Sequence, residues 1–505
     1  MKLYKYLFYI TVLVLVSSCK KILTQEPKNS TYAEKFWKSA RDCETATAGN
    51  YALLRSALAF RNGHYMYGDA VAKLYFTIDY NGDGLEGIQN GDYSFKYNVN
   101  DFGNWSRFFK VITMSNTILE KVPKISDEQL LEGDVANPGR FRNEILGQAL
   151  FVRAYTYFEM TRIWGDVPLV TEYYDNPLTA PQLARSSKVD VMKQIEKDAR
   201  DAAALLDWGY ASNPSGAVVT ANRGSAYALL AHLYMWRGTT LKAASGGTIE
   251  MKDINSADTA IDVLEQKGGY SLTDTAQYYK TFIGKSSEGI FELSMTEDYD
   301  EGSNTSIGMQ FLRGREYVDY FGTYARMAVK KDYLNEHFPD NDTNDVRFKK
   351  NFDYRQDDRP LCRKYSNIVY RNPGAKVDAY TSNNMIIFRL ADMKLLKAEI
   401  AIYKDEPQKA MDIINFFRVR NGTDEIVGIP DPEYLMYYYI LERGKELYLE
   451  GHLFYDLVRT KTGSYMIGWL TDQRHAREGF YWPVDPRLFK GNKSLLQTTF
   501  WLGKI

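Results

Sequence analysis

The chain has 505 residues, of which 45% are hydrophobic and 25% charged, the ordinary composition of a protein that folds in water. This composition argues against a disordered chain and against a protein with many membrane spans. The 63 Lys and Arg residues are balanced by 64 Asp and Glu residues, so the chain lacks the positive field that attracts nucleic acid. Aromatic residues are abundant, with 39 Tyr, 25 Phe and 8 Trp, and we expect part of them to face a ligand.

The first nineteen residues are typical of a bacterial export signal. Lys2 and Lys5 precede an apolar run from Leu7 to Val16, about half of the ~20 residues that a membrane-spanning helix needs. The following Ser17-Ser18-Cys19 resembles a lipoprotein box, in which the cysteine is acylated, as with palmitate, and becomes the new N-terminus. We therefore expect residues 1–18 to be a lipoprotein signal peptide and Cys19 to carry lipid. Secretion with a coincidental cysteine is the alternative.

Residues 19–31 are polar and show no apolar periodicity, so they are predicted to form a flexible tether behind the lipid. Two or more acyl chains on Cys19 would anchor the protein stably to a membrane. The other two cysteines, Cys43 and Cys362, are far apart in the sequence and form neither a disulfide framework nor a metal cluster.

Helical patterns dominate the chain beyond the tether. Ser39, with Asp42 three residues later, predicts a capped helix that runs to about Phe60. Between Tyr270 and Met385 the helical periodicity fades into short β-like runs such as Ile290–Leu293. The remaining expected helices are Trp105–Lys121, Arg142–Trp164, Val189–Leu206, Arg223–Arg237, Ala257–Lys267, Ile387–Tyr403, Gln408–Arg420 and Glu433–Arg459.

Three of these helices combine small residues with aromatic ones, as in Ala154-Tyr155, Ala226-Tyr227 and Ala401…Tyr403. Small residues let helices approach closely while aromatic rings fill the adjoining grooves, which is typical of tetratricopeptide-like helix pairs. No clean 34-residue period is present. The pattern by itself therefore predicts helix pairs packed in a curved array.

Two stretches rich in glycine or in acidic residues resemble known ligand-binding loops. Gly82–Gly87 matches GxGxxG, but a loop-like composition follows it, so a dinucleotide would find no helix N-terminus there. Asp79–Gly84 matches the opening of a calcium loop, but the twelfth position is Asn90 in place of the bidentate Glu. Asp340–Asp345 is a second oxygen-rich run. We expect solvated turns in both, with a looser calcium site as the open alternative.

Signatures of catalysis are scarce. The sequence has no HExxH or GxSxG motif, and its five histidines are scattered singly. His232 and His452 are expected within helices as structural residues. A glycosidase with paired carboxylates stays open, because sequence alone gives no distance between the many acidic residues.

Several motifs, taken in order, resemble the SusD/RagB family of Bacteroidetes outer-membrane lipoproteins. They cover nearly the whole chain, which makes a chance match improbable. Leu390 stands where the family more often has Tyr, and Gly444 where a second Arg is common. The matching segments are Cys19, Phe36–Ser39, Arg153–Tyr155, Gly165–Val170, Arg223–Tyr227, Arg389–Met393 with Ala398-Glu399, Ile414–Arg420, Glu442–Leu447, Glu450–His452, Phe454–Leu457, Pro483 and Gln497.

This resemblance implies a mostly α-helical SusD-like single domain over residues 32–505. Its helical scaffold would cover about 32–270 and 386–460, and an irregular, ligand-facing excursion about 271–385. Family members capture oligosaccharides, or in some cases peptides, outside the cell and pass them to a SusC-like TonB-dependent transporter that they cover as a lid. The resemblance implies a binding protein of the outer membrane, lipid-anchored and facing the cell exterior, with no catalytic residue, no metal and no cofactor.

The acidic and basic residues of the C-terminal motif have a structural interpretation. Glu442 and Glu446 share one helical face, as do Arg443 and Glu450 at longer spacing. We expect these charges to lie buried at a helix junction and to pair with one another.

Ligand contacts are expected from aromatic residues in loops, because sugar rings present apolar C–H faces with polar edges. Aromatic residues within helices, such as Trp105, Tyr155 and Tyr234, are expected in the core instead. The predicted ligand-binding residues are Tyr75, Tyr80, Tyr97, Tyr299, Tyr317 and Tyr320, with Asp79 and Arg315 as polar partners.

Overall fold

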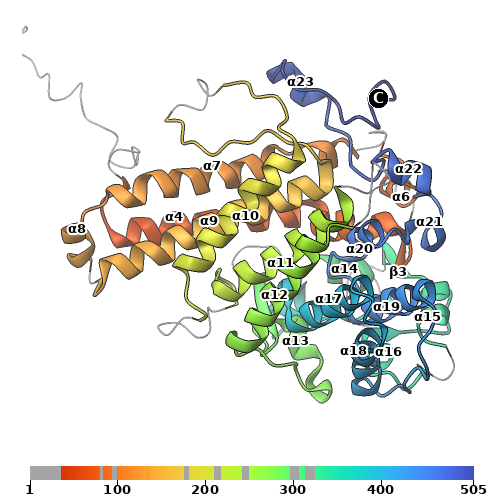
Figure 1. Ribbon diagram of the computed structural model, residues 1–505. Helices are drawn as coiled ribbons and strands as arrows, with labels where there is room; N and C mark the ends of the chain where they lie inside the picture. The colour runs from red at the N-terminus through yellow and green to blue at the C-terminus, as the bar shows by residue number, and fades with distance from the viewer. Residues whose placement is uncertain are drawn as a thin grey trace, which may run out of the picture.

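The computed structural model describes residues 36–79, 84–93, 99–133, 135–175, 181–209, 218–241, 249–295, 306–312, 325–339 and 342–505 (Figure 1). Helices predominate and the strands are few and short, so the predicted fold class, mostly α, is confirmed. The lipoprotein box at Cys19 and the expected tether lie outside the described residues. Among the described helices, none has both the length and the apolar character needed to cross a membrane.

The long helices pack one against the next in an array that Figure 1 shows from α4 through α18. Local sequence signals start several of them. Ser39 caps the first with the expected capping box to Asp42, and Asn222 caps α11 in the same way. The long helices are α4 (Ala40–Ala59), α7 (Ser106–Lys121), α9 (Pro138–Trp164), α10 (Lys188–Leu205), α11 (Arg223–Thr240), α12 (Met251–Lys267), α17 (Leu390–Tyr403), α18 (Pro407–Arg420) and α19 (Pro432–Glu446).

Ion pairs between helices reveal their antiparallel arrangement. Lys404 bonds Asp258 at 2.5 Å and Lys394 bonds Glu265 at 2.8 Å, so ascending positions on α12 meet descending positions on α17. Between α9 and α10, the buried Arg153 and Asp198 pair at 2.7 Å. Neighbouring helices that run antiparallel and pack through apolar faces form helix pairs, as the pattern of small and aromatic residues predicted.

Short helices and strands fill the remainder of the described chain. The strands form four antiparallel pairs, β1 (Phe76–Ile78) with β3 (Met327–Val329), β2 (Gly289–Leu293) with β8 (Met385–Arg389), β4 (Phe352–Asp353) with β5 (Leu361–Cys362), and β6 (Ile368–Asn372) with β7 (Val377–Thr381). The short helices used below are η1 (Phe60–Asn62), α5 (Gly63–Gly68), α6 (Leu85–Ile88), α14 (Ile307–Leu312) and α20 (Leu453–Arg459).

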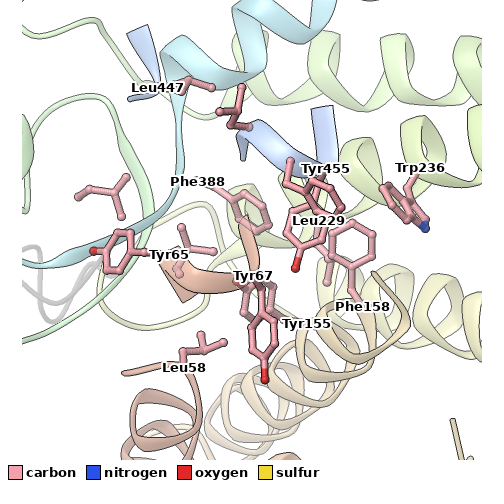
Figure 2. Packing of buried hydrophobic residues seen from close by; sticks show 14 of the residues in the cluster. Leu58, Tyr65, Tyr67, Tyr155, Phe158, Leu229, Trp236, Phe388, Leu447 and Tyr455 are labelled. Atoms are coloured by element: carbon pink, nitrogen blue, oxygen red, sulfur yellow. The ribbon is translucent and has the colours of Figure 1, made fainter. Parts of the chain in front are cut away.

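One large hydrophobic core joins these elements. Its rings and aliphatic side chains come from α4, α5, α9, α11, β8 and α20, and they meet as Figure 2 shows. Trp105, Tyr155 and Tyr234 are all buried, which confirms that helical aromatic residues belong to the core. Cys43 and Cys362 are buried free thiols.

Several helix predictions differ from the structure in their bounds. α9 begins at Pro138 in place of Arg142, and α12 begins at Met251 in place of Ala257. Residues 387–389 belong to β8, and α17 begins only at Leu390, because the preceding residues pair with β2. The single helix expected over Glu433–Arg459 is two helices, α19 and α20, with His452 at the start of the second.

The segment between α19 and α20 packs tightly against the end of α5. Gly451 has a φ of 78°, and a Cβ placed on Gly68 would lie 2.1 Å from the Gly451 carbonyl oxygen. The Gly451 N–H donates to Asp69 Oδ2 at 2.7 Å. Gly68, the last residue of α5, and Gly451, which lies between α19 and α20, thus approach closer than any side chain would allow.

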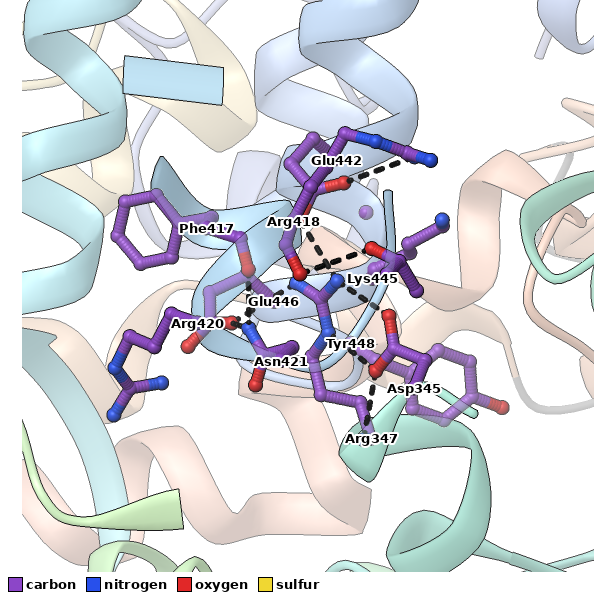
Figure 3. Close-up of polar contacts among 12 residues, drawn as sticks. Asp345, Arg347, Phe417, Arg418, Arg420, Asn421, Glu442, Lys445, Glu446 and Tyr448 are labelled. Atoms are coloured by element: carbon purple, nitrogen blue, oxygen red, sulfur yellow. Dashed lines mark hydrogen bonds and ion pairs between the residues drawn. The ribbon is translucent and has the colours of Figure 1, made fainter. Parts of the chain in front are cut away.

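Buried charges bind α19 to distant segments, and Figure 3 shows the group around Arg347. Arg347 contacts Asp345, Glu442 and Glu446, all fully buried. Arg389 binds both Glu446, at 2.9 Å, and Glu450, at 2.7 Å, and Lys364 also binds Glu450 at 2.6 Å. Buried charges are tolerated when they are paired in this way.

The structural role expected of this motif is supported, and its buried charges pair within the motif at Arg443 and Asp456, whereas the expected pair of Arg443 with Glu450 is wrong. Arg443 binds Asp392 at 2.7 Å and Asp456 at 2.6 Å, and has no ion pair with Glu450 among the described contacts. The partners come from other elements because the helix is broken after Glu446, which removes the regular spacing on which the prediction depended.

Candidate functional site

A cavity of about 460 Å³ lies where several distant segments meet. This volume is within the range of small-molecule sites, roughly 300–1,000 Å³. Its described lining comes from the end of α4, from η1 and α5, from the residues after β2, from the start of α14, and from β7 and β8. The site residues are Ser56, Ala59, Phe60, Arg61, Asn62, Tyr65, Met295, Ser306, Ile307, Gly308, Tyr365, Thr381, Asn383 and Met385.

Larger hollows elsewhere lack this combination of segments. A groove of about 780 Å³ between α4 and α7 is lined mainly by apolar side chains, including Phe36 and Trp37. A hollow of about 710 Å³ is formed by α18 and the loop that follows it. Ligand sites usually combine apolar walls with a few convergent polar groups, and of these three hollows the cavity beside η1 draws both from many separate segments.

The edge of the cavity beside α4 has an unusual backbone. Arg61 and Asn62 are both in the left-handed region, with φ of 51° and 58°. This conformation costs an ordinary residue roughly 1–2 kcal/mol, and such strain gathers at functional sites. The turn ends α4 and starts α5 at Gly63, so it projects Phe60 and Arg61 at the cavity edge.

Phe60 is the aromatic platform of this edge. Its residue is 40% exposed, unusually high for a phenylalanine beside a large core. The Arg107 guanidinium lies 5.1 Å from the centre of its ring and holds the ring in place by a cation–π contact. An exposed, supported ring of this kind suits the apolar face of a sugar.

The opposite walls are held by hydrogen bonds. Ser306 Oγ and Thr381 Oγ1 lie 2.6 Å apart. Asn383 donates to the Phe282 carbonyl oxygen at 2.7 Å and accepts from the Asn367 N–H at 3.0 Å. These bonds tie β7 and the residue Asn383 after it to the segment before α14 and to two further segments, so the walls are preformed.

Two tyrosines, Tyr65 and Tyr365, line the buried side of the cavity. Tyr65 and Tyr365 meet edge to face with ring centres 5.8 Å apart, and the Tyr365 hydroxyl donates to the Leu449 carbonyl oxygen at 2.6 Å. Burial raises the pKa of both tyrosines above the usual value of 10, so both stay neutral at physiological pH. They supply shape and polarity without charge.

A buried carboxylate stands behind the wall. Glu292 Oε2 accepts from the Asn384 side chain and from the Lys285 N–H, both at 2.8 Å, and burial raises the pKa of Glu292 to about 7. Asn384 also accepts from the N–H of Met295, a lining residue. Glu292 therefore supports the wall from outside the cavity.

The predicted ligand residues fall in different places. Tyr75 was expected on an exposed loop and is instead 1% exposed, because its ring packs against Tyr333 and Tyr448 in the core. Asp79 is partly exposed and pairs with Arg359 at 2.6 Å. Tyr80, Tyr97, Tyr299, Arg315, Tyr317 and Tyr320 lie outside the described residues.

Some of these predicted residues are close to the cavity in sequence. Met295 and Ser306, which both line it, precede and follow Tyr299. Arg315, Tyr317 and Tyr320 follow α14, whose first residues line the cavity.

Phe60, Arg61 and Asn62 were missed from the sequence, where Phe60 was expected only as a helix end. The Asn62-Gly63 pair is a turn signal and was the available clue.

The second oxygen-rich run, which ends at Asp345, carries carboxylates that the chain's own cations neutralise. Asp342 is bound by Lys445 at 2.7 Å and by Arg418 at 3.2 Å, and Asp345 by Arg347 at 2.7 Å. These ion pairs leave the two carboxylates little charge with which to attract a calcium ion.

The GxGxxG stretch lacks the helix that a dinucleotide site needs. Gly82 lies outside the described residues, and the helix after it, α6, has a single turn. Such a helix is too short to bind a pyrophosphate at its N-terminus.

His232, Asp392 and His452 are the one group among the described residues with metal-ligand composition and spacing. The two imidazole rings are nearly parallel, 14° apart, with centres 5.5 Å from each other. The buried guanidinium of Arg443 lies against Asp392, and its positive charge opposes a cation at this place. Asp392 is also bound by His232 at 2.6 Å and by Arg443 at 2.7 Å, so the arrangement is a structural ion-pair cluster.

Comparison with known proteins identifies the family. Residues 77–235 match a SusD-like family model described as "Starch-binding associating with outer membrane", and residues 353–501 match the SusD_RagB model. The SusD-like protein P38 of Formosa agariphila is 25% identical over 97% of this chain and 98% of its own length. The SusD-like protein P25 of the same organism is 23% identical over 91% and 90%.

Solved structures share the fold. A SusD superfamily protein from Bacteroides thetaiotaomicron superposes with a TM-score of 0.76 at 24% identity, covering 92% of this chain and 99% of the other. NanU of B. fragilis gives a TM-score of 0.71 at 23% identity, covering 94% and 99%. Matches at both ends of the chain, together with this common fold, place the protein in the SusD/RagB family of outer-membrane nutrient-binding proteins.

Proposed function

We propose that this protein captures oligosaccharides at the cell surface and delivers them to a SusC-like TonB-dependent transporter, without catalysing a reaction. The cavity beside η1 carries the proposal, because it combines an exposed, supported aromatic ring at Phe60 with neutral hydroxyl and amide groups on its walls. Sugars offer the matching surfaces, apolar C–H faces and polar edges.

The absence of a carboxylate from the described lining favours binding over hydrolysis. A glycosidase needs two carboxyl groups that flank the scissile bond, roughly 5–10 Å apart. Arg61 is the ionised side chain among the lining residues that the structure describes, and the other polar groups there are hydroxyls and amides. The described lining thus has groups for recognition and none suited to protonating a leaving group.

The delivery arrangement is part of the same proposal. Residues 1–18 direct export, residues 19–31 form a tether from a lipidated Cys19, and the domain over residues 32–505 faces the exterior beside its transporter. Tyr299, Arg315, Tyr317 and Tyr320 would add ligand contacts, together with Tyr80 and Tyr97. Asp79 would also contact the ligand, but it would contribute less to binding because its carboxylate pairs with Arg359.

Calorimetry and a product assay on one glycan panel test the proposal. The full chain is expected to bind at least one glycan and to release no reducing ends. Replacing Phe60 with Ala should weaken that binding about tenfold, since stacking on one aromatic ring contributes roughly 1 kcal/mol or more. Val427→Ala, on a 96% exposed residue of the α18 hollow, is the control.

Four results would contradict the proposal. Product formation would indicate the surface-anchored glycosidase, and binding of peptides in place of glycans would indicate the peptide-binding alternative. Lipid labelling that persists in Cys19→Ala, or failure to co-purify with a TonB-dependent transporter from membranes, would contradict the delivery arrangement.

A further inference from the structure

Three positively charged side chains gather where the end of the chain meets the short helix α22 (Asp472–Ala476), at the upper right of Figure 1. They surround the ring of Phe500. The charged groups of Lys504, Arg474 and Arg477 lie 3.3, 5.1 and 5.5 Å from the centre of this ring. Together with neighbouring apolar side chains they form a surface that we call the C-terminal patch. It consists of Arg474, Arg477, Phe500, Leu502, Lys504 and Ile505.

Arg474 fixes the patch and adds a charge behind it. Its Nε donates to the Gly479 carbonyl oxygen at 3.0 Å, and its Nη2 donates to the Gly91 carbonyl oxygen at 2.7 Å. These bonds join α22 to the segment after α6. Asp92 attracts the same guanidinium and offsets part of its charge. We therefore assign contact with a partner to the other two cations of the patch.

Arg477 and Lys504 are exposed, and neither has an ion pair among the described contacts. Glu478, the acid next to Arg477, is bound by Lys188 at 2.6 Å instead. The pKa of Lys504 is lowered by loss of solvent and by repulsion from Arg477 and Arg474. The patch thus holds like charges close together, and a negatively charged partner would relieve their repulsion.

Exposed apolar side chains lie beside these charges in the sequence. Leu502 is 67% exposed and Ile505 is 39% exposed. Phe500 is anchored to the core, because its ring packs at 5.1 Å against Trp501, whose Nε1 donates to the Tyr481 carbonyl oxygen at 2.9 Å. Proteins bind membrane surfaces with this combination of groups, since basic side chains meet anionic headgroups while apolar ones enter the boundary below them.

We propose that the C-terminal patch docks on the phosphate-bearing surface of a lipid membrane. Arg477 and Lys504 bind headgroup phosphates, and Leu502 and Ile505 enter the boundary between the headgroups and the acyl chains. The complementary charge favours this partner, and the exposed aliphatic side chains favour a lipid surface over a phosphate ion in solution.

Docking of the patch would orient the domain. The proposed tether, residues 19–31, would hold the domain near a membrane without fixing its orientation. A second contact at the C-terminal patch would fix that orientation. The inference uses the membrane location of the protein and does not depend on which ligand the cavity binds.

Binding to vesicles of defined composition tests the inference. The mature chain, residues 19–505, is produced without its signal peptide and therefore without lipid, so that only its own surface can hold it to a membrane. It is mixed with phosphatidylcholine vesicles that contain phosphatidylglycerol and with vesicles of phosphatidylcholine alone, and the bound fraction is measured by sedimentation. Binding to the anionic vesicles should be roughly tenfold stronger or more, and it should decrease as the salt concentration rises.

Substitutions in the patch test which residues carry this binding. Each Lys or Arg near an anionic surface strengthens binding about fivefold, so Arg477→Gln combined with Lys504→Gln should weaken binding about 30-fold. Leu502→Ser should weaken it several-fold, because it removes an apolar side chain. Lys252→Gln combined with Lys280→Gln, at two exposed lysines outside the patch, controls for the loss of two charges. An unchanged midpoint in thermal melting establishes that each variant is folded.

Equal binding to neutral and anionic vesicles, or equal losses in the double variant of the patch and in its control, would overturn the inference. Saturable binding of inorganic phosphate in calorimetry, by a chain that does not bind the vesicles, would also overturn it, because the patch would then be a site for a soluble anion. Glycan binding is measured on the same preparations and should be equal in the wild type and the double variant. The proposed function therefore stands if vesicle binding fails, and it is contradicted by a chain that binds no glycan.

Discussion

Replacing Glu292 with Gln tests whether its carboxylate behind the cavity wall is held protonated by burial. Glu292 is buried on β2, with Asn384 and Lys285 donating to one of its oxygens. Burial raises its pKa from 4.5 to about 7 despite these donors. An acid with a raised pKa binds its proton more tightly in the folded state, so its stabilising effect is complete below pH 4.5 and is lost as the pH rises through 7.

The magnitude follows from the two pKa values. Each unit of difference is worth 1.36 kcal/mol, so the wild-type chain should lose roughly 2.5 kcal/mol of unfolding free energy through this group between pH 5 and pH 8. Gln is neutral at every pH and keeps an oxygen for the two donors. Glu292→Gln should therefore be more stable than the wild type at pH 8, relative to pH 5, by roughly 2.5 kcal/mol.

Urea unfolding of both chains at pH 5 and pH 8 measures this difference. In thermal melting it corresponds to a relative shift of roughly 2–3 °C, because the entropy of unfolding scales with the size of the domain. Glu425→Gln, at an exposed position, controls for the loss of one negative charge. Parallel pH profiles for the wild type and Glu292→Gln would refute the reasoning, since they would mean that Glu292 is equally charged in the folded and unfolded states.

Two further substitutions probe the α19 region. Glu446→Gln should lose roughly 3–5 kcal/mol at pH 7, because it leaves Arg389 buried with one charge fewer beside it. Burial would raise the pKa of Glu446, but its arginine partners hold this pKa at about 2. The loss of unfolding free energy in Glu446→Gln should therefore shrink as the pH falls from 4.5 toward 2. A loss that does not change with pH in urea unfolding would contradict this reasoning. Gly451→Ala should destabilise the fold by a few kcal/mol more than Gly428→Ala, measured by the same unfolding. Both glycines have a positive φ, but a Cβ on Gly451 would lie 2.4 Å from the His64 ring whereas one on Gly428 meets open space, so equal losses would disprove the steric explanation.

The order of helices was predictable because their signals are local. A capping residue such as Ser39 acts on backbone groups three residues away, and apolar periodicity within α9 or α11 depends only on that segment. The family motifs are likewise short runs of adjacent residues.

The errors arose where distant segments meet. The segment between α19 and α20 packs against Gly68, and the partners of Arg443 come from α17 and α20. Tyr75 lies beside aromatic residues more than 250 positions away, which no local pattern can indicate.

The amino-acid sequence by itself determined the family, the mostly helical fold class and the positions of most long helices, because these depend on interactions between residues that are neighbours along the chain. Only the tertiary structure decided which side chains form the cavity. Phe60 and Arg61 lie at the edge of this cavity because a turn presents them to walls built from β7, β8 and α14, more than 240 residues later. Contacts at that separation depend on how every intervening element packs.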